Sequence, residues 1–351
     1  MVQYDIAIIG AGPAGATLAR VLGQKCPDKK ILLLDGETGG IRKVCGGLLS
    51  EDAQELLAKM NLVLPKDVLE DPQIFSVDTI DLTLGFGRSY VRHYLNMDRA
   101  AFDRWLISLI GKSVDITVGR CIKLEKTDTG HALTLKTDSG VALVNTKYLV
   151  GADGASSIVR RTFFKDKLYR YVSIQQWFRI TDPKLPYYSC IFDKKTSDSC
   201  SWTITKGDYY IFGGAFPKNG CRKAFEEQKS RLEDYLGVKL GEPVRTEACL
   251  VASPRRRSDF LTGKDGVYLV GEAAGFISAS SFEGISSAML SGMLLADAIA
   301  EGASTEKVTF LYRKKVRKLI SKLSLKIPKM KILTSPLLRS IILKSGITAI
   351  K

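Results

Sequence analysis

A glycine-rich turn near the start of the chain has the residue spacing of a dinucleotide-binding site. The turn consists of Gly10, Ala11, Gly12, Pro13, Ala14 and Gly15. An apolar run over residues 4–9 predicts a strand before the turn, and the pattern that follows predicts a helix. In such a turn the first glycine permits the bend, the second lets the backbone approach a diphosphate, and the third lets the helix pack on the strand. The phosphates then lie on the N–H groups at the positive end of the helix dipole.

An acidic residue follows at the position that such a site requires. Asp35 ends a second strand-like run over residues 31–34, about 20 residues after Gly15. A carboxylate there accepts hydrogen bonds from the hydroxyl groups of an adenosine ribose, and Gly36 comes directly after it. A glycine turn alone also has a purely structural reading, but the strand, the helix and Asp35 together predict a bound dinucleotide. They do not choose between NAD and FAD.

A cysteine followed by two glycines is the next candidate. Gly46 and Gly47 would let the backbone come close to a flat ring, and the Cys45 thiol could assist proton delivery there or pack against a substrate. The alternative is a tight turn with an incidental thiol. Arg99 opens a helical pattern over residues 97–110, and its alternative reading is a solvated charge on that helix.

Two further glycine-rich segments follow strand-like runs later in the chain. The first, over residues 151–161, begins Gly-Ala-Asp-Gly, and the second begins with Gly271 and Glu272 before a long helical pattern. Both segments resemble fingerprints of the aromatic-hydroxylase-like flavoprotein superfamily, and the Cys45 loop resembles that of the geranylgeranyl reductase family within it. The resemblance implies non-covalently bound FAD rather than NAD.

The resemblance also implies which residues contact the cofactor. Glu272 stands where the superfamily has an aspartate that binds the ribityl chain of the flavin, and Arg99 matches an arginine near the cofactor phosphates. The remaining contacts that it implies, besides the glycine turn, are Asp35, Gly36, Cys45, Gly46, Gly47, Cys121, Ala152, Asp153, Gly154, Gly271, Gly284 and Ile285.

A family motif of the form Tyr-x-Trp-x-Phe-Pro-Lys has a partial counterpart here. Residues 200–206 keep Trp202 and Lys206 but lack the tyrosine, the phenylalanine and the proline. The resemblance implies that Trp202, with Cys45, lies at a reshaped substrate cavity, whose wall would include Tyr210; ordinary core packing of Trp202 is the alternative. Other segments, at 72–77, 174–178, 188–193 and 271–281, resemble the colicin M resistance branch of the family, so that the resemblance spans nearly the whole chain.

The elements that must position these residues indicate an α/β fold. A Rossmann-type FAD-binding domain of the aromatic-hydroxylase type, with an inserted antiparallel-sheet substrate domain and a basic helical tail, fits the pattern of strands and helices. A β-meander is predicted over residues 114–150. The expected boundaries are 1–71, 96–165 and 262–300 for the FAD-binding domain, 72–95 and 166–261 for the substrate domain, and 301–351 for the tail.

The net charge of +15 is concentrated in the tail. Residues 307–351 contain 13 basic and no acidic residues, which leaves 39 basic against 37 acidic residues elsewhere. A basic amphipathic helix is predicted over 311–327, ended by Pro328. Each basic residue near an anionic membrane surface contributes about 1 kcal/mol of attraction, so the segment 311–351 is expected to contact such a surface. The alternative is that the apolar face of the helix packs on the body; nucleic acid is disfavoured because stacking platforms are lacking.

Composition limits the remaining possibilities. Seven scattered cysteines and two histidines predict neither a metal site nor a disulfide framework, and no signal peptide or spanning segment is apparent. We therefore expect a cytoplasmic protein, peripheral on the inner face of the cytoplasmic membrane. The expected function is an FAD-dependent oxidoreductase that reduces double bonds of an isoprenoid or other hydrophobic substrate. An FAD-dependent monooxygenase and a non-catalytic lipid-binding flavoprotein are the alternatives, and the reductant, NAD(P)H or another donor, stays open, as does the oligomeric state.

Overall fold

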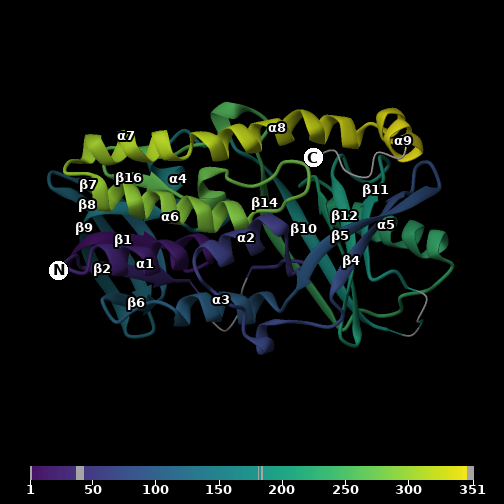
Figure 1. The fold of residues 1–351 in the computed structure, drawn as a ribbon, viewed down its shortest axis with the longest axis horizontal. Helices are drawn as coiled ribbons and strands as arrows, with labels where there is room; N and C mark the ends of the chain where they lie inside the picture. Colours follow the sequence, from purple (N-terminus) through teal and green to yellow (C-terminus); the bar gives the residue numbers. More distant parts are fainter. Residues whose placement is uncertain (1, 37–42, 181, 183–184, 346–351) are drawn as a thin grey trace.

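The computed structural model describes residues 2–36, 43–180, 182 and 185–345, and these form two eight-stranded sheets (Figure 1). The first sheet has the order β15-β16-β9-β1-β2-β6, and β7 and β8 are attached through β9. Its strands are β1 Val2–Ile9, β2 Ile31–Asp35, β6 Val114–Val118, β7 Arg120–Thr127, β8 Gly130–Thr137, β9 Gly140–Gly151, β15 Gly263–Lys264 and β16 Val267–Leu269. The strands at its centre are parallel, as a nucleotide-binding sheet requires.

Helices cover the first sheet and form the connections between its parallel strands. The helix α1 runs from Pro13 to Lys25 between β1 and β2 and packs on α6, Ile285–Glu301. The predicted βαβ unit and the meander of β7, β8 and β9 are present. The start of the meander predicted over residues 114–150 is divided at Gly119 into two strands, because β6 pairs with β2 whereas β7 turns away to pair with β8.

The second sheet has the order β14-β10-β13-β12-β11-β4-β5-β3. Its strands are β3 Leu48–Leu49, β4 Ile74–Asp81, β5 Phe86–Asn96, β10 Tyr169–Arg179, β11 Tyr188–Phe192, β12 Cys200–Lys206, β13 Tyr209–Phe216 and β14 Arg245–Ser253. The pairing is antiparallel except between β4 and β11, which are far apart in the chain and cannot be joined by a hairpin. The helix α5, Cys221–Leu236, covers one face, where its Phe225 and Leu232 are buried.

The shorter elements lie in the connections between these strands and helices. They are α2 Glu51–Lys59, α3 Arg99–Ser108, α4 Ile158–Phe163, and the 3-10 turns η1 Lys66–Val68, η2 Gly154–Ser156, η3 Arg257–Asp259 and η4 Gly271–Ala274. The strand β3, which follows the Cys45 loop, pairs with β5 of the second sheet, so that this loop lies where the sheets meet.

The tail forms three helices, α7 Thr305–Lys315, α8 Arg317–Thr334 and α9 Pro336–Ser345, and residues 346–351 of the predicted tail lie outside the described part. The expectation of one helix ended by Pro328 is wrong. The break lies at Val316, and Pro328 sits inside α8 on its exposed side, where burial of Leu323 and Ile327 holds the helix together across the lost hydrogen bond.

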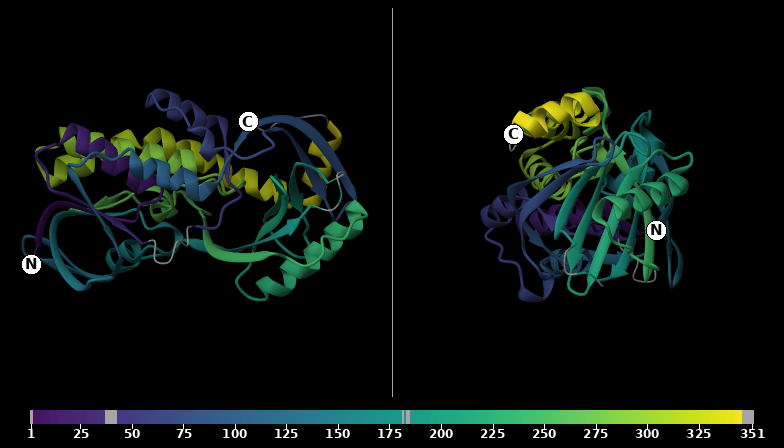
Figure 2. Two further views of the ribbon diagram at one scale, coloured as in Figure 1. Left: turned by 90° about the horizontal axis from the view of Figure 1, so that it is seen from below. Right: turned by 90° about the vertical axis from the view of Figure 1, so that its right-hand side faces the viewer.

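The apolar side of the tail helices packs on the body, as in the alternative reading of the tail. The residues that join the core of the first sheet are Val308, Tyr312, Val316, Leu319, Leu323 and Ile327. The Tyr312 hydroxyl donates a hydrogen bond to the Leu269 carbonyl at 2.8 Å. From there the helices continue along one side of the molecule, so that α8 and α9 reach the second sheet (Figures 1 and 2). Within the described ranges, none of the helices has the length and apolarity that crossing a bilayer demands.

Candidate cofactor and substrate site

A single cavity of about 840 Å³ lies at the carboxyl ends of the central parallel strands, where nucleotides bind in this type of sheet. The structure brings most of the predicted cofactor residues together in its lining. They are Gly10, Gly12, Pro13, Ala14, Asp35, Gly36, Cys45, Gly46, Gly47, Arg99, Cys121, Ala152, Asp153, Gly154, Glu272, Gly284 and Ile285. The predicted residues Gly15 and Gly271 are not in the lining, because both serve packing: a Cβ on Gly15 would lie 1.9 Å from the Gly10 carbonyl oxygen, and one on Gly271 2.8 Å from the Ala14 side chain.

The glycine turn has the shape that a diphosphate needs. Gly10 has φ +105°, and a Cβ there would lie 2.6 Å from the Ala152 carbonyl oxygen, so only glycine fits. At Gly12, by contrast, no atom lies within 4 Å of the Cβ position. The first turn of α1 is therefore open toward the cavity, and its N–H groups are available to an anion.

Asp153 offers a second test of the fit to the predicted cofactor. Its Oδ2 accepts a hydrogen bond from the Ile158 N–H at 2.7 Å, whereas its Oδ1 is buried without a hydrogen-bond partner among the described residues. Burial raises the pKa of this carboxyl group. A buried polar atom without a partner at the edge of a cavity is suited to a hydroxyl or N–H donor on a ligand. Cys121 lies in the same wall, and burial raises the pKa of its thiol to about 12, with the Asp153 charge acting in the same direction.

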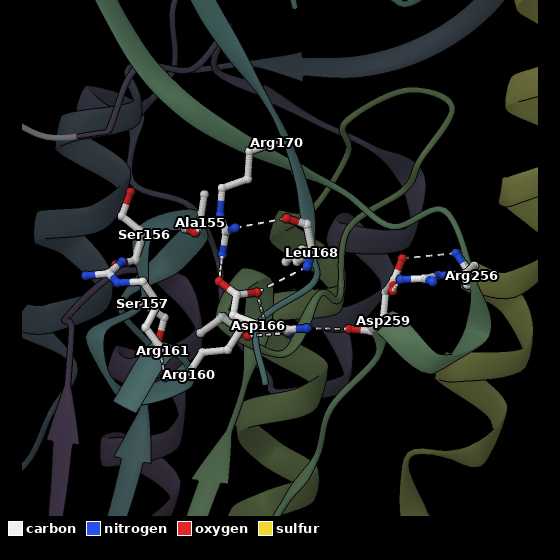
Figure 3. A network of polar contacts seen from close by, with 11 residues as sticks. Ala155, Ser156, Ser157, Arg160, Arg161, Asp166, Leu168, Arg170, Arg256 and Asp259 are labelled. Carbon is white, nitrogen blue, oxygen red and sulfur yellow. Dashed lines mark hydrogen bonds and ion pairs between the residues drawn. The ribbon is translucent and has the colours of Figure 1, made fainter. Parts of the chain in front are cut away.

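An arginine that the sequence reading did not assign holds this wall in place. The Arg160 guanidinium donates to Asp166 Oδ1 at 3.0 Å and to the carbonyl oxygens of Ala273 and Asp259, both at 2.9 Å (Figure 3). Arg170 contacts the same carboxylate and also donates to the Ala155 carbonyl. The network thus ties the segment after β9 to the segment after β16, which carries Glu272.

Glu272 is engaged by the protein rather than pointing freely into the cavity. Its Oε1 accepts a hydrogen bond from the Ala252 N–H at 2.8 Å, and its Oε2 is in contact with the Lys43 ammonium. Burial opposes the charge of Lys43, but the Glu272 carboxylate outweighs it and raises the pKa of Lys43. The extra methylene of glutamate relative to aspartate lets the carboxylate reach both partners at the cavity wall. Lys43 was missed as a site residue, although it lies two positions before Cys45 in the chain.

The Cys45 loop is held by a buried lysine of the second sheet. Lys206 donates hydrogen bonds to Asn96 Oδ1 at 2.6 Å, to the Met97 carbonyl at 2.6 Å and to the Gly47 carbonyl at 3.2 Å. Gly47 has φ +66°, and a Cβ there would lie 2.3 Å from the Met97 carbonyl oxygen. The Gly47 N–H in turn donates to Cys45 Sγ at 3.4 Å, so Lys206 positions the loop that presents the thiol.

Burial lowers the pKa of Lys206 from its usual 10.5 to about 8, which predicts a pH-dependent stability. Below pH 8 the folded and unfolded chains both carry the proton, and the penalty for the buried charge is present in full. Between about pH 8 and 10.5 only the folded chain releases the proton, so this group makes the folded state more stable as the pH rises. Relative to Lys206→Met, the wild-type free energy of unfolding should gain up to about 3 kcal/mol across that window.

Denaturant titrations at several pH values would measure this gain. The exposed Lys264→Met is the control and should track the wild type at every pH. A difference between wild type and Lys206→Met that stays constant from pH 7 to 10 would contradict the prediction.

Arg99 lies in the cavity wall and not on a solvated helix face. Its side chain is only 12% exposed, and Nε is 2.8 Å from Asp103 Oδ1. Burial alone would lower the pKa of the guanidinium, but the neighbouring Asp103 and Cys45 outweigh this effect and the pKa is raised. A permanent cation therefore stands beside the Cys45 thiol.

Trp202 lines the cavity, whereas the expectation for Tyr210 is wrong. The indole Nε1 of Trp202 is buried without a hydrogen-bond partner in the described chain, and the absence of a side chain at Gly213 makes room for the ring. Tyr210 pairs with Thr205, and alternate residues of a strand point to opposite faces. Its ring therefore packs with Phe212 and the other core residues beneath α5, away from the cavity.

The far end of the cavity holds a polar cluster of Tyr94, Glu283 and Arg92 to which the sequence analysis assigned no role. The Tyr94 hydroxyl donates to Glu283 Oε1 at 2.6 Å, and Arg92 lies 3.6 Å from the same oxygen. The Tyr188 ring meets the Tyr94 ring edge-on, with the centroids 5.5 Å apart. Burial raises the pKa of both phenols, so they stay protonated across the physiological range. The other lining residues at this end are Cys190, Cys200, Ser201, Trp202, Ile204, Val251 and Phe282.

The two-sheet fold of the chain is similar to the folds of solved structures, flavin-dependent enzymes among them. A geranylgeranyl bacteriochlorophyll reductase-like protein of Thermoplasma acidophilum is similar with a TM-score of 0.81, at 18% identity over 100% of this chain and 92% of that one. The p-nitrophenol 4-monooxygenase PnpA of Pseudomonas putida is similar with a TM-score of 0.74, at 15% identity over 98% and 93% of the two chains. The flavin-dependent brominase Bmp2 has a TM-score of 0.70, at 19% identity over 98% and 93%. The expected fold class is confirmed.

The family follows from sequence identity over the whole chain. The chain is 43% identical over 356 residues to Protein CbrA of Escherichia coli strain K12 and to Protein CbrA of Shigella sonnei, covering 100% of this chain and 99% of each relative. It belongs to the CbrA family, which confirms the expected resemblance to the colicin M resistance branch. No protein-family model matches the chain.

Proposed function

We propose that the chain is an FAD-dependent oxidoreductase that reduces a carbon–carbon double bond of a hydrophobic, isoprenoid-type substrate. The observation that carries the proposal is the continuity of the cavity. It begins at the open glycine turn, passes the Cys45 loop and ends among apolar and aromatic side chains such as Tyr188, Trp202 and Ile204. A dinucleotide cofactor and an apolar substrate can therefore meet within one enclosure.

The residues around the cavity suit the parts of FAD. The first turn of α1 would hold the diphosphate, Asp35 the adenosine ribose, and the wall formed by Asp153 and Glu272 the ribityl chain. Bound FAD, once reduced, supplies a hydride for the substrate double bond. The Cys45 loop, held by Lys206, would orient the substrate beside the ring, and the aromatic side chains would exclude water.

The test of this proposal is anaerobic turnover of a polyprenyl alcohol by the photoreduced protein. We expect a product heavier than the substrate by two hydrogen atoms. Product that forms only with oxygen, and is heavier by one oxygen atom, would instead support a monooxygenase. A cavity that retains polyprenyl alcohol without any turnover would support the non-catalytic binding protein.

Cys45 is expected to deliver the proton that accompanies the hydride. General acids contribute a factor of about 100 or more, so Cys45→Ala should lower turnover by about 100-fold and leave flavin absorbance per chain unchanged. Cys26→Ala, which lies outside the cavity at the end of α1, is the matched control and should turn over normally. A loss of less than about threefold in Cys45→Ala would assign the thiol to packing alone.

A further inference from the structure

The C-terminal helix α9 has two faces with opposite environments. Arg339 and Leu343 point into the body and are buried. Leu337, Leu338 and Ile341 lie on the other side of the helix and are exposed to 72%, 41% and 57%. Because the inner face is fixed in the body, the helix cannot rotate to hide these three side chains. In the described part of the chain, α9 therefore presents an apolar face with no covering element.

The inner face of α9 is fixed by ionic and backbone contacts. Arg339 Nε is 2.7 Å from Asp81 Oδ2 on β4, and the guanidinium lies over the Phe192 ring at 4.7 Å. From β5, Arg88 donates to the Leu343 carbonyl at 3.0 Å. These contacts set the orientation of the exposed face relative to the second sheet.

Positive charge extends along the tail helices, and Lys344 lies on the same side of α9 as Leu337. The exposed basic residues of α7, α8 and α9 are Lys307, Arg313, Lys314, Arg317, Lys318, Lys322, Lys331 and Lys344. Of these, Lys322 is paired with Asp52 of the body at 2.7 Å. No acidic residue occurs between residue 307 and the end of the chain. The surface of the tail thus combines positive charge with exposed apolar side chains.

This combination distinguishes between the partners that could cover α9. A second copy of this chain would cover the leucines but would bring two surfaces of the same sign together. A nucleic acid would neutralise the cations but leave the apolar side chains in water, and an acidic protein would need an apolar groove shaped to α9 beside its acidic residues. An anionic bilayer satisfies both features, because lipid head groups attract the cations and the acyl boundary accepts Leu337, Leu338 and Ile341.

The helix before α9 passes over the substrate end of the cavity. Met330 Sδ of α8 accepts a hydrogen bond from Ser253 Oγ at 3.9 Å. Ser253 lies on β14, the strand that contributes Val251 to the cavity. Burial lowers the pKa of Lys329, and among nearby charges Arg92 acts in the same direction whereas Glu283 opposes it. Figures 1 and 2 show α8 and α9 running along the same side of the second sheet.

We infer that the outer face of α9, together with the basic residues along the tail helices, docks on an anionic lipid bilayer and brings the substrate end of the cavity to the membrane surface. The docking is supported by the features of the tail alone. Delivery of a lipid substrate into the cavity rests, in addition, on the proposed function.

The test is co-sedimentation of the full chain with vesicles of phosphatidylglycerol mixed with phosphatidylcholine, and with vesicles of phosphatidylcholine alone. Wild type should bind the anionic vesicles and lose binding as salt rises, since the attraction is screened. The triple variant Leu337→Gln, Leu338→Gln, Ile341→Gln should bind about tenfold or more weakly. These side chains are exposed, so the variant keeps the buried contacts of Arg339 and Leu343.

A matched control removes three exposed apolar side chains elsewhere. The control variant is Ile122→Gln, Val141→Gln, Leu143→Gln, on the strands β7 and β9, and it should bind anionic vesicles as wild type does. Equal binding by wild type and the α9 variant would overturn the inference, as would failure of wild type to bind either vesicle. A wild-type dimer that the α9 variant converts to a monomer would overturn it in favour of a second copy.

The readouts separate this inference from the proposed function. Vesicle binding is measured without turnover, and flavin absorbance of the same samples reports on the cofactor. Binding to anionic vesicles with no reduction of any polyprenyl alcohol would leave the docking intact and refute the reductase. Anaerobic turnover of detergent-dispersed substrate with no vesicle binding would support the reductase and refute the docking.

Discussion

Replacing Gly12 with aspartate is expected to abolish FAD binding while the chain stays folded. Gly12 is the N-cap of α1, at φ −68° and ψ −176°, a backbone conformation open to any residue, and no atom lies within 4 Å of the Cβ position. Aspartate is a preferred N-cap residue and, relative to glycine, stabilises a helix by roughly a few tenths of a kcal/mol. Its carboxylate would occupy the N–H groups that the diphosphate needs and would repel it. We expect affinity for FAD to fall by about 1,000-fold or more, equivalent to about 4 kcal/mol.

The measurements for Gly12→Asp are flavin absorbance per chain after purification, titration of the apoprotein with FAD, and thermal unfolding of the apoprotein. Ser304→Asp is the matched control, because it places the same charge at the exposed N-cap of α7, where the Ser304 hydroxyl accepts the Lys307 N–H at 3.3 Å. The control should bind FAD as wild type does. A yellow Gly12→Asp protein would show that the diphosphate does not lie on this helix.

The parts of the site that the sequence predicted are those made by local chain geometry. The glycine turn and Asp35 are joined by one strand–helix–strand unit, so their spacing in the chain fixes their spacing in space. The segments containing Asp153 and Glu272 each follow a strand of the same sheet, β9 and β16, and parallel strands end at one edge. Their placement in one cavity therefore follows from fold class, without knowledge of side-chain packing.

The substrate end could not be predicted in the same way. Tyr94 and Glu283, which share a hydrogen bond, are 189 positions apart in the chain and belong to different sheets or connections. Lys206 and Gly47 are likewise 159 positions apart. The pairing of the second sheet, with its parallel contact between β4 and β11, helps to bring Lys206 to Gly47, whereas Glu283 reaches Tyr94 from the loop between η4 and α6. No periodicity or spacing in the sequence encodes that pairing.

The tail shows how packing overrides local propensity. The periodicity of residues 311–327 predicted a helix with one apolar face. It did not decide whether that face contacts a membrane or the body of the protein, because both can bury apolar side chains. In the structure Tyr312 and Leu323 of that predicted face pack on the body, whereas Leu337 and Ile341, which lie beyond the predicted helix, remain exposed. Removing residues 311–351 would therefore strip the core of the first sheet and would not be a clean test of membrane contact, in contrast to substitutions confined to α9.

Replacing Arg339 with methionine is expected to lower the free energy of unfolding by about 3–5 kcal/mol, the range for breaking a buried ion pair from one side. Arg339 is 2% exposed and Asp81 is fully buried. Methionine would fill much of the space but leave the Asp81 carboxylate without its cation, although Oδ1 would keep the N–H groups of Thr83 and Leu84 at 2.9 and 3.1 Å. The tail would lose its ionic contact with the second sheet and keep the Arg88 hydrogen bond to the Leu343 carbonyl, so we expect α9 to open more readily than the body. Urea titration and amide exchange of α9 measure the two effects.

A double-mutant cycle separates the charge from the packing. Asp81→Asn keeps the acceptor for Thr83 and Leu84 but removes the unpaired charge, so the double variant Asp81→Asn, Arg339→Met should recover most of the lost stability. Lys344→Met, on the exposed side of the same helix, is the control and should change stability by less than about 0.5 kcal/mol. If Arg339→Met and the double variant were equally destabilised, the loss would come from packing against Phe192 and the Leu333 carbonyl, and the ion pair would contribute little to holding the tail across the two sheets.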